Sequence, residues 1–330
     1  MPTVSEFGTT QDVAITILMD NRADLIVKST KTIKYFIRGP LLAEHGFAAL
    51  VHLKDAGLRI LWDGGLTRGA LPENMRRMKV DPPKIDMIAL SHGHDDHTAA
   101  VSDVLRAMNL RPQEKAWKPG TPVEELRRYA DGRHVPLVAH PAAFRERWDM
   151  DKGQPRYGPG VPAPRAEWEA LGAQVILSEG PYRLGPGCWT TGRVPRRSFE
   201  RSGRPPAGRL TYREGETFHP DDIEEDQAIV IHIKDKGLVV LAGCAHSGIV
   251  NTVNYARETS GVERVYALLG GFHLARASDD EIGRTIAAIK ELNPAMVVPS
   301  HCTGFKAQCQ FAREMPKQFV AGVVGATYLF

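Results

Sequence analysis

The sequence predicts an α/β protein in which helices cover a core of β-sheet. Short runs of apolar and β-branched residues recur along its 330 residues, and Gly, Pro, Asp or Asn bounds each run, as is typical of β-strands. Helical patterns lie between the later runs. Many strands with helices between them indicate stacked layers of sheet and helix.

The expected elements follow one another along the chain. Strands are expected in the first half at 13–19, 47–53, 58–63, 85–90, 135–140 and 173–178. In the second half they are expected at 228–233, 237–243, 264–270 and 295–300. The segment KDKG between two of these strands predicts a hairpin turn. Helices are expected at 101–108 and at 279–291, where acidic residues occupy the first turn.

A single domain over residues 1–330 is expected, with three insertions that act as loops or lids. They lie near 109–133, 149–165 and 193–227, and strand patterns resume on either side of the first two. The second is rich in Pro and Gly, and the third begins with a run of arginines.

Composition argues against several classes of protein. Hydrophobic residues make up 42% and charged residues 25%, which is an ordinary globular balance. A net charge of +3 is too small to indicate a nucleic-acid partner, and four scattered cysteines do not indicate a disulfide framework. No apolar run is long enough to span a membrane, and no signal peptide is visible. We therefore expect a cytoplasmic protein without a membrane partner; assembly into a homo-oligomer stays open.

The strongest signal is the heptapeptide SHGHDDH at 91–97, directly after an expected buried strand. His92 and His94 are two residues apart, so on an extended segment their side chains point the same way and can bind one ion. A tight turn then presents Asp96 and His97 to a second ion. Imidazole and carboxylate suit zinc, and also manganese or iron. The heptapeptide therefore predicts one or two divalent metal ions, with zinc as the first choice.

Within this heptapeptide, HGHDDH resembles the HxHxDH signature of the metallo-β-lactamase superfamily. The resemblance implies an αββα sandwich, two mixed sheets flanked by helices, with metal ligands on loops at one edge. LRILWDGG, GLVVLAGC and MVVPSHCTG resemble further landmarks of that superfamily, in the same order. AEHGFAALV, GCAHSGIVN, GGFHL and PSHCTG together resemble the branch of 7,8-dihydropterin-6-methyl-4-(β-D-ribofuranosyl)aminobenzene-5′-phosphate synthase-like proteins.

The resemblance implies roles for residues outside the heptapeptide. Asp63 orients the metal-binding turn without touching the metal, and His301 is a ligand. Arg193, in TTGRVPR, stands where the superfamily usually has a ligand histidine. Cys244 stands in place of the metal-bridging aspartate, and it is either a thiolate ligand or a small buried hydrophobe. His246 is expected as a ligand or a close neighbour of the metal, and it can replace the missing histidine.

Acid–base chemistry is expected from three side chains at the metal site. Asp96 would hold the second ion and orient the nucleophile or accept its proton. His246 or His273 would protonate the leaving group. His273 follows an expected buried strand and two glycines, which let backbone or substrate come close.

Substrate contacts are expected from the arginine-rich segment. It holds six arginines between 193 and 209, and guanidinium groups match phosphate and carboxylate oxygens. We expect Arg193 and Arg196 to bind an anionic group of a small substrate, and the later arginines to be solvated. His45, in AEHG, belongs to the branch resemblance and is a further candidate for substrate contact.

Three functions are compatible with these residues. The first is a metal-dependent hydrolase that uses metal-activated water on a small anionic ester, phosphoester or lactone. The second is a pterin-pathway synthase-like enzyme that forms a C–N bond at the same site. The third is a non-catalytic, metal-dependent sensor.

Overall fold

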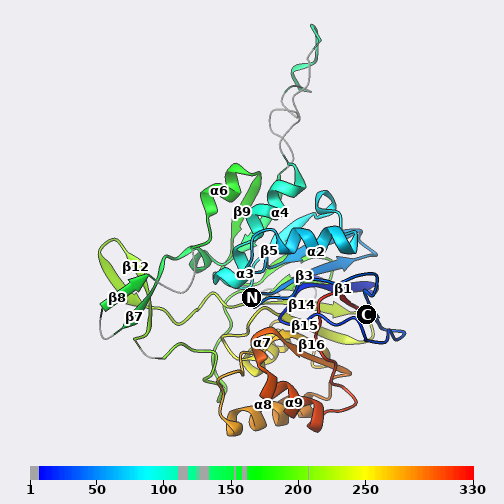
Figure 1. Ribbon diagram of the computed structural model, residues 1–330, viewed down its shortest axis with the longest axis vertical. Helices are drawn as coiled ribbons and strands as arrows, with labels where there is room; N and C mark the ends of the chain where they lie inside the picture. The colour runs from blue at the N-terminus through cyan, green and yellow to red at the C-terminus, as the bar shows by residue number, and fades with distance from the viewer. Residues whose placement is uncertain are drawn as a thin grey trace.

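The computed structural model describes residues 7–110, 118–124, 126, 134–151, 154–157, 162–206 and 208–330. Two β-sheets stack face to face, helices cover both outer faces, and a small third sheet projects from one side (Figure 1). The αββα arrangement implied by the resemblance is therefore confirmed, and every expected strand is present.

The first sheet has eight strands and is antiparallel at one end and parallel at the other. Strands β4, β5, β6 and β9 run parallel to one another. In spatial order the strands are β2 (Ile33–Tyr35), β18 (Ala326–Leu329), β1 (Val13–Met19), β3 (Ala48–Leu53), β4 (Leu58–Trp62), β5 (Met87–Ala89), β6 (Val135–Ala139) and β9 (Ala173–Leu177).

The second sheet has six strands, of which the last three are parallel. The predicted hairpin is present, because β14 and β15 pair in antiparallel register on either side of KDKG. In spatial order the strands are β10 (Tyr182–Gly185), β11 (Cys188–Thr190), β14 (Ala228–Ile233), β15 (Gly237–Ala242), β16 (Val265–Gly271) and β17 (Met296–Ser300).

Helices α2, α4 and α6 lie on the outer face of the first sheet, and α7, α8 and α9 lie on that of the second (Figure 1). The two expected helices are confirmed as α4 and α8. The helices are α2 (Ala70–Met78), α3 (Asp95–Thr98), α4 (Val101–Met108), α6 (Arg165–Ala170), α7 (Ile249–Ser260), α8 (Asp279–Leu292) and α9 (Phe305–Glu314), with short 3₁₀ turns at η1 (Pro82–Lys84), η2 (Pro141–Phe144) and η3 (His301–Thr303).

Three apolar layers hold the sandwich together. The middle layer lies between the sheets, where Ile15 and Val51 of the first sheet meet Ile229 and Leu241 of the second. Each outer layer lies between a sheet and its helices. Burying one large aliphatic side chain stabilises a fold by about 1.5–3 kcal/mol. The middle layer buries many such side chains from both sheets, so it stabilises one alignment of the sheets. That alignment brings together the strand ends at which the candidate site forms.

The parallel strands place chemistry at one edge of the sandwich. Strands β4 and β5 of the first sheet, and β15, β16 and β17 of the second, all end there. Residues just beyond these ends adopt positive φ angles at Asp63, Ala245, His273 and His301. Such backbone conformations are uncommon outside glycine and concentrate at functional sites.

The small third sheet corrects part of the expectation for the insertions. Residues 149–165 and 193–227, which were expected to be loops or lids, contribute strands to it. Its strands are β13 (Thr217–Pro220), β12 (Leu210–Glu214), β7 (Arg147–Asp151) and β8 (Gln154–Tyr157). The expected insertion at 109–133 lies largely outside the described residues, as do parts of 149–165. Among the described residues, no helix is long and apolar enough to cross a membrane.

Candidate metal centre

Two groups of potential metal ligands meet where the strands end. In each group, one donor atom from every residue lies within 4.8 Å of the others. The groups adjoin, because the His92 and His97 ring centroids are 4.3 Å apart. The first group is His92, His94 and His246, and the second is Asp96, His97, Cys244 and His301.

The first group consists of three imidazoles from two sheets. His92 and His94 follow β5, and His92 Nε2 lies 3.1 Å from His94 Nδ1. His246, beyond β15, packs its ring 4.8 Å from that of His92 and 5.0 Å from that of His94. Nδ1 of His246 donates to the carbonyl oxygen of Gly203 over 2.8 Å, which leaves Nε2 with a lone pair. That Nε2 is buried and has no hydrogen-bond partner.

Burial keeps these three imidazoles neutral. It lowers the pKa of His92 and His246 well below the usual value, and that of His94 to about 3, with smaller contributions from neighbouring cationic groups. Neutral imidazole is the form that binds a metal ion. Three neutral imidazoles, one of which has a buried nitrogen without a hydrogen-bond partner, form a group that fits a divalent cation.

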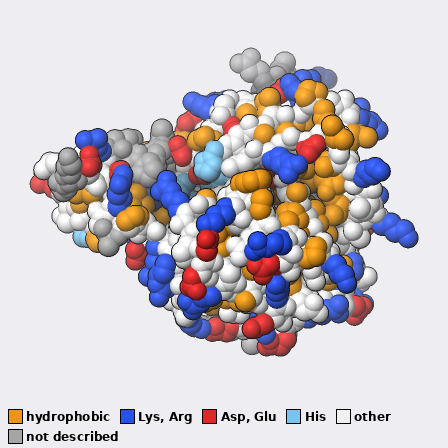
Figure 2. All heavy atoms as spheres, turned by 60° about the horizontal axis from the view of Figure 1, so that its bottom comes forward, with side chains coloured by type: hydrophobic (Ala, Val, Ile, Leu, Met, Phe, Trp, Pro, Cys, Tyr) orange, Lys and Arg blue, Asp and Glu red, His pale blue; other side chains and the backbone are white. Residues whose placement is uncertain are grey.

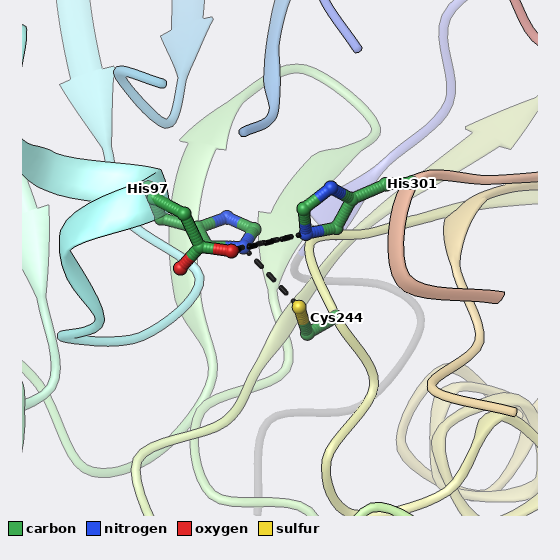
Figure 3. A group of neighbouring side chains, drawn as sticks. His97, Cys244 and His301 are labelled. Carbon is green, nitrogen blue, oxygen red and sulfur yellow. Dashed lines mark hydrogen bonds and ion pairs between the residues drawn. The ribbon is translucent and has the colours of Figure 1, made fainter. Parts of the chain in front are cut away.

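The second group combines carboxylate, thiol and imidazole donors (Figure 3). His97 Nε2 lies 3.2 Å from both Cys244 Sγ and His301 Nε2. Asp96 Oδ2 lies 3.3 Å from His301 Nε2 and 3.6 Å from His97 Nε2. Figure 3 shows His97, Cys244 and His301 converging from three separate segments of the chain. Zinc prefers this mixture of nitrogen, sulfur and oxygen donors.

Electrostatics in the second group also fit a cation. Burial opposes charge on His97, but the negative charges of Asp96 and Asp63 raise its pKa to about 9, so the site favours a positive charge that a metal ion would supply in place of the proton. Burial likewise opposes charge on Asp96, but His97 and His301 hold its pKa well below the usual range. Burial raises the pKa of the Cys244 thiol well above its usual value. A divalent ion would stabilise the thiolate and the carboxylate together.

Asp63 contacts the metal-binding turn through its carboxylate. Its carboxylate accepts hydrogen bonds from the backbone N–H and the hydroxyl of Ser91, each over 2.7 Å. It also accepts from His97 Nδ1 over 2.7 Å. Asp63 is fully buried and belongs to neither group of ligands.

Gly93, between His92 and His94, passes very close to neighbouring backbone. A Cβ atom there would lie 2.1 Å from the carbonyl oxygen of Ala143, so only glycine fits. The Gly93 N–H donates to Glu225 over 3.3 Å, and Glu225 pairs with the buried Arg147. The close approach and the buried ion pair together fix the path of the turn.

The end of β1 supports His301 and brings His45 to the rim. Asp20 accepts a hydrogen bond from the His301 backbone N–H over 3.0 Å, and Asn21 Oδ1 lies 3.0 Å from His301 Nδ1. His45 stacks on His301 with ring centroids 5.0 Å apart, and its Nε2 lies 3.6 Å from Asp96 Oδ2. The structure thus brings His45 to the site, whereas Asp20 and Asn21 were not singled out from the sequence.

The segment 198–204 was also missed as an organiser of the site. Glu200 is buried and accepts from the first backbone N–H groups of α7, at Val250 and Asn251, over 3.0 Å each. The anchored segment directs the Ser202 carbonyl to His273 Nδ1 and the Gly203 carbonyl to His246 Nδ1. A Cβ at Gly203 would lie 2.4 Å from the His246 carbonyl oxygen. In the sequence, the glycine within the arginine-rich segment was the signal that could have pointed to this role.

A cavity of about 700 Å³ opens onto the first group of ligands. Surface histidine and Lys or Arg side chains meet in the hollow between the projecting lobe and the main body (Figure 2). His273 also lines the cavity, with its ring centroid 4.2 Å from that of His246. The lining residues are His94, Asp149, Ser202, Gly203, Arg204, Pro205, Pro206, Arg209, Leu210, Ile223, His246, His273 and Arg276.

The prediction for Arg193 and Arg196 needs correction. Neither residue lines this cavity; both line a smaller pocket of about 240 Å³. Arg193 is largely exposed and pairs with Glu224 at 2.9 Å, while Arg196 donates to backbone carbonyls of Asp222 and Ile223. Just before Arg193, Gly192 has a φ of 63°, and the backbone N–H of Arg193 donates to the carbonyl oxygen of Glu179 over 2.9 Å. His246 stands at the first group, and Arg204, Arg209 and Arg276 line the cavity.

Comparison with known proteins shows that most of this chain is similar to a named enzyme. The 7,8-dihydropterin-6-methyl-4-(β-D-ribofuranosyl)-aminobenzene-5′-phosphate synthase of Methanocaldococcus jannaschii is 30% identical over 285 residues, which cover 85% of this chain and 88% of that protein. The chain belongs to the metallo-β-lactamase superfamily, in the branch of this synthase. The uncharacterized protein MJ0448 of the same organism is 28% identical over 302 residues, covering 91% of this chain and 97% of that protein.

Solved structures show the same metallo-β-lactamase fold. Tm1679, described as a metal-dependent hydrolase of the β-lactamase superfamily, aligns with a TM-score of 0.68 and 23% identity over 96% of this chain and 98% of that one. The metallo-β-lactamase fold protein YhfI of Bacillus subtilis aligns with a TM-score of 0.51 and 12% identity over 97% of this chain and 100% of that one. No protein-family model matches the chain.

Proposed function

We propose that the protein is a metal-dependent hydrolase that acts on a small anionic ester, phosphoester or lactone. The observation that supports it is the pair of adjoining donor groups, one of which opens onto the 700 Å³ cavity. Two divalent cations, zinc first among them, would be held by His92, His94 and His246 on one side and by Asp96, His97, Cys244 and His301 on the other.

Side chains of the protein divide the remaining work. When bound, divalent cations lower the pKa of water toward 7 and polarise the bond under attack. Asp96 stays ionised and orients the attacking nucleophile. His273 donates from Nδ1 to the Ser202 carbonyl, so its Nε2 is the nitrogen that can accept a proton. Burial lowers the pKa of His273, which keeps the ring neutral and able to take up a proton and return it to the leaving group.

His246 is assigned to metal binding rather than to proton transfer. Its Nδ1 is used by Gly203, and its Nε2 points into the first group of ligands. The sequence leaves open whether His246 or His273 protonates the leaving group, and this assignment removes His246 from that role. His273, which lines the cavity, is the remaining acid–base residue.

A second function is favoured by the synthase relative. That protein is named for a product that joins a dihydropterin to a ribofuranosyl-aminobenzene phosphate, at 30% identity to this chain. The same donor groups would then serve formation of a C–N bond, in which the amine nitrogen of the phosphorylated partner would displace a leaving group from a carbon of the dihydropterin donor. The cavity would hold the phosphorylated partner.

A substrate screen with metal-replete protein separates the two. Phosphomonoesters, phosphodiesters, carboxylic esters and lactones are each incubated with the parent and with the His92→Ala/His94→Ala double variant. The hydrolase proposal expects turnover of at least one class by the parent and none by the double variant. No hydrolysis, together with joining of a dihydropterin donor to a phosphorylated ribofuranosyl-aminobenzene, would replace hydrolase by synthase.

A further inference from the structure

We propose that the arginine side of the cavity is a receptor for a phosphate group that the substrate carries in addition to its reacting group. The inference rests on the proposed function in one respect: the reacting end of the substrate lies at the metal ligands. It adds the class of substrate, which is an organic molecule with a phosphate at one end and an apolar body between its two ends. Arg204 and Arg276 are the residues that would bind the phosphate.

Arg204 has a guanidinium nitrogen that lacks an acceptor. Its Nε is buried and makes no hydrogen bond. Among the residues that the structure describes, no carboxylate forms an ion pair with it. An unsatisfied buried donor on a charged group is costly, and a bound anion would remove that cost. Arg204 lines the same cavity as His94 and His246, and it also lines the smaller pocket of Arg193 and Arg196.

Arg276 approaches the cavity from a different part of the chain. It follows β16, lies near His273, and is exposed. Its charge adds to the effect of burial in lowering the pKa of His273. Within the described ranges, Arg276 also has no ion-pair partner. Two unpaired guanidinium groups at one cavity match a dianion better than a single negative charge.

The third arginine of the cavity is already occupied. Arg209 pairs with Asp149 through two hydrogen bonds of 2.9 and 3.1 Å, so its charge is neutralised locally. This pair closes the side of the cavity formed by the small sheet. Arg204 and Arg276 are therefore the cations that remain available to a ligand.

The receptor is held in place before any ligand arrives. Glu281, in the first turn of α8, accepts hydrogen bonds from the backbone N–H groups of Arg201 and Ser202, over 2.7 and 2.9 Å. Glu200, in the same loop, accepts from the first N–H groups of α7, so both helices hold the loop just before Arg204. Preorganised groups bind more tightly because less conformational freedom is lost on binding.

Apolar residues also line the cavity. Pro205, Pro206, Leu210 and Ile223 line it alongside the arginines. A pocket with apolar walls and a few polar groups that converge is typical of small-molecule sites. An apolar or planar body between phosphate and reacting group would fill this space.

Binding of alkane bisphosphonates to the metal-loaded protein tests the inference. These compounds are not hydrolysed, and chains of two, four or six carbons let one phosphonate sit at the metals while the other reaches the arginines. Each is compared by calorimetry with the monophosphonate of the same chain length. We expect at least one bisphosphonate to bind about tenfold or more tightly than its monophosphonate, as one charged hydrogen bond would give.

That advantage should fall to near one in Arg204→Ala and in Arg276→Ala. Arg193→Ala is the matched control, because it removes the same charge from the neighbouring pocket and should keep the advantage. Metal content is measured in every variant; if Arg204→Ala loses metal, Arg276→Ala alone decides.

Three outcomes would overturn the inference: no advantage in the parent, an advantage that survives in Arg276→Ala, or an equal loss in Arg193→Ala. Failure of the hydrolase proposal would look different. The substrate screen would then show no hydrolysis while the advantage of the bisphosphonate still depended on Arg276.

Discussion

His97 and Asp63 form a buried pair in which imidazole Nδ1 donates to carboxylate Oδ2 over 2.7 Å. Both side chains are fully buried. Because Nδ1 is committed to Asp63, Nε2 is the nitrogen that faces Cys244 and His301. A partner of this kind fixes the tautomer and orientation of an imidazole and strengthens it as a ligand.

Asp63→Asn should weaken metal binding by about 10–100-fold while the protein stays folded. The amide nitrogen cannot accept a hydrogen bond, so either His97 or the Ser91 turn loses a partner. Metal affinity is measured by competition with a chelator. Asp86→Asn is the control, since Asp86 accepts from the Arg59 N–H at the opposite end of the same two strands. Equal affinity in Asp63→Asn and the parent would contradict the role given to Asp63.

His246→Ala should remove the metal of the first donor group and leave that of the second. His246 supplies one of three imidazoles there, and its Nε2 is buried without another partner. Elemental analysis after dialysis gives the metal content. His52→Ala, a half-buried histidine of β3 outside both groups, should keep the parent's content. Full metal content in His246→Ala would mean that His246 does not replace the ligand histidine that the superfamily usually has where Arg193 stands.

Gly93→Ala should disrupt the metal-binding turn. The added Cβ would lie 2.1 Å from the Ala143 carbonyl oxygen, and relieving such overlap costs about 1–3 kcal/mol of stability. We expect a lower free energy of unfolding in urea together with reduced metal content. Gly39→Ala meets nothing within 4 Å and should match the parent on both measures. A fully stable, metal-loaded Gly93→Ala protein would show that the turn can move.

Arg147→Met should destabilise the protein by about 3–5 kcal/mol, because it leaves buried carboxylates without their cation. Arg147 is 4% exposed and pairs with Asp221 and Glu225, both fully buried. Urea unfolding measures the loss. The exposed pair of Arg156 with Asp151 provides the comparison, and Arg156→Met should cost about 0–1 kcal/mol. Similar costs for the two variants would argue against a structural role for the buried network.

The layered fold could be predicted because its strands carry continuous apolar runs. The small sheet could not, because LTYRE of β12 and TFHP of β13 are short, largely polar and partly exposed. Helix α7 begins where Glu200, about fifty residues earlier in the chain, accepts its first N–H groups. A cap supplied from so far away leaves no local pattern in the sequence.

The candidate site could be predicted only where local geometry decides it. Alternation along an extended segment correctly brought His92 and His94 together. Cys244 and His246 are also two residues apart, yet they lie in different donor groups. Ala245 between them has a φ of 55°, which breaks the alternation. Such a backbone conformation depends on the packed strand ends around it.

Asp149 and Leu210 of the small sheet, and Arg209 just before β12, line the cavity, but no residue of this sheet belongs to either donor group. The reactive centre is built on the strand ends of the sandwich, whereas one wall of the cavity is built on an appended piece. Changes in the appended strands can therefore alter which molecules fit while the metal ligands stay intact. A fold arranged in this way can acquire new substrates in evolution without rebuilding its reactive centre.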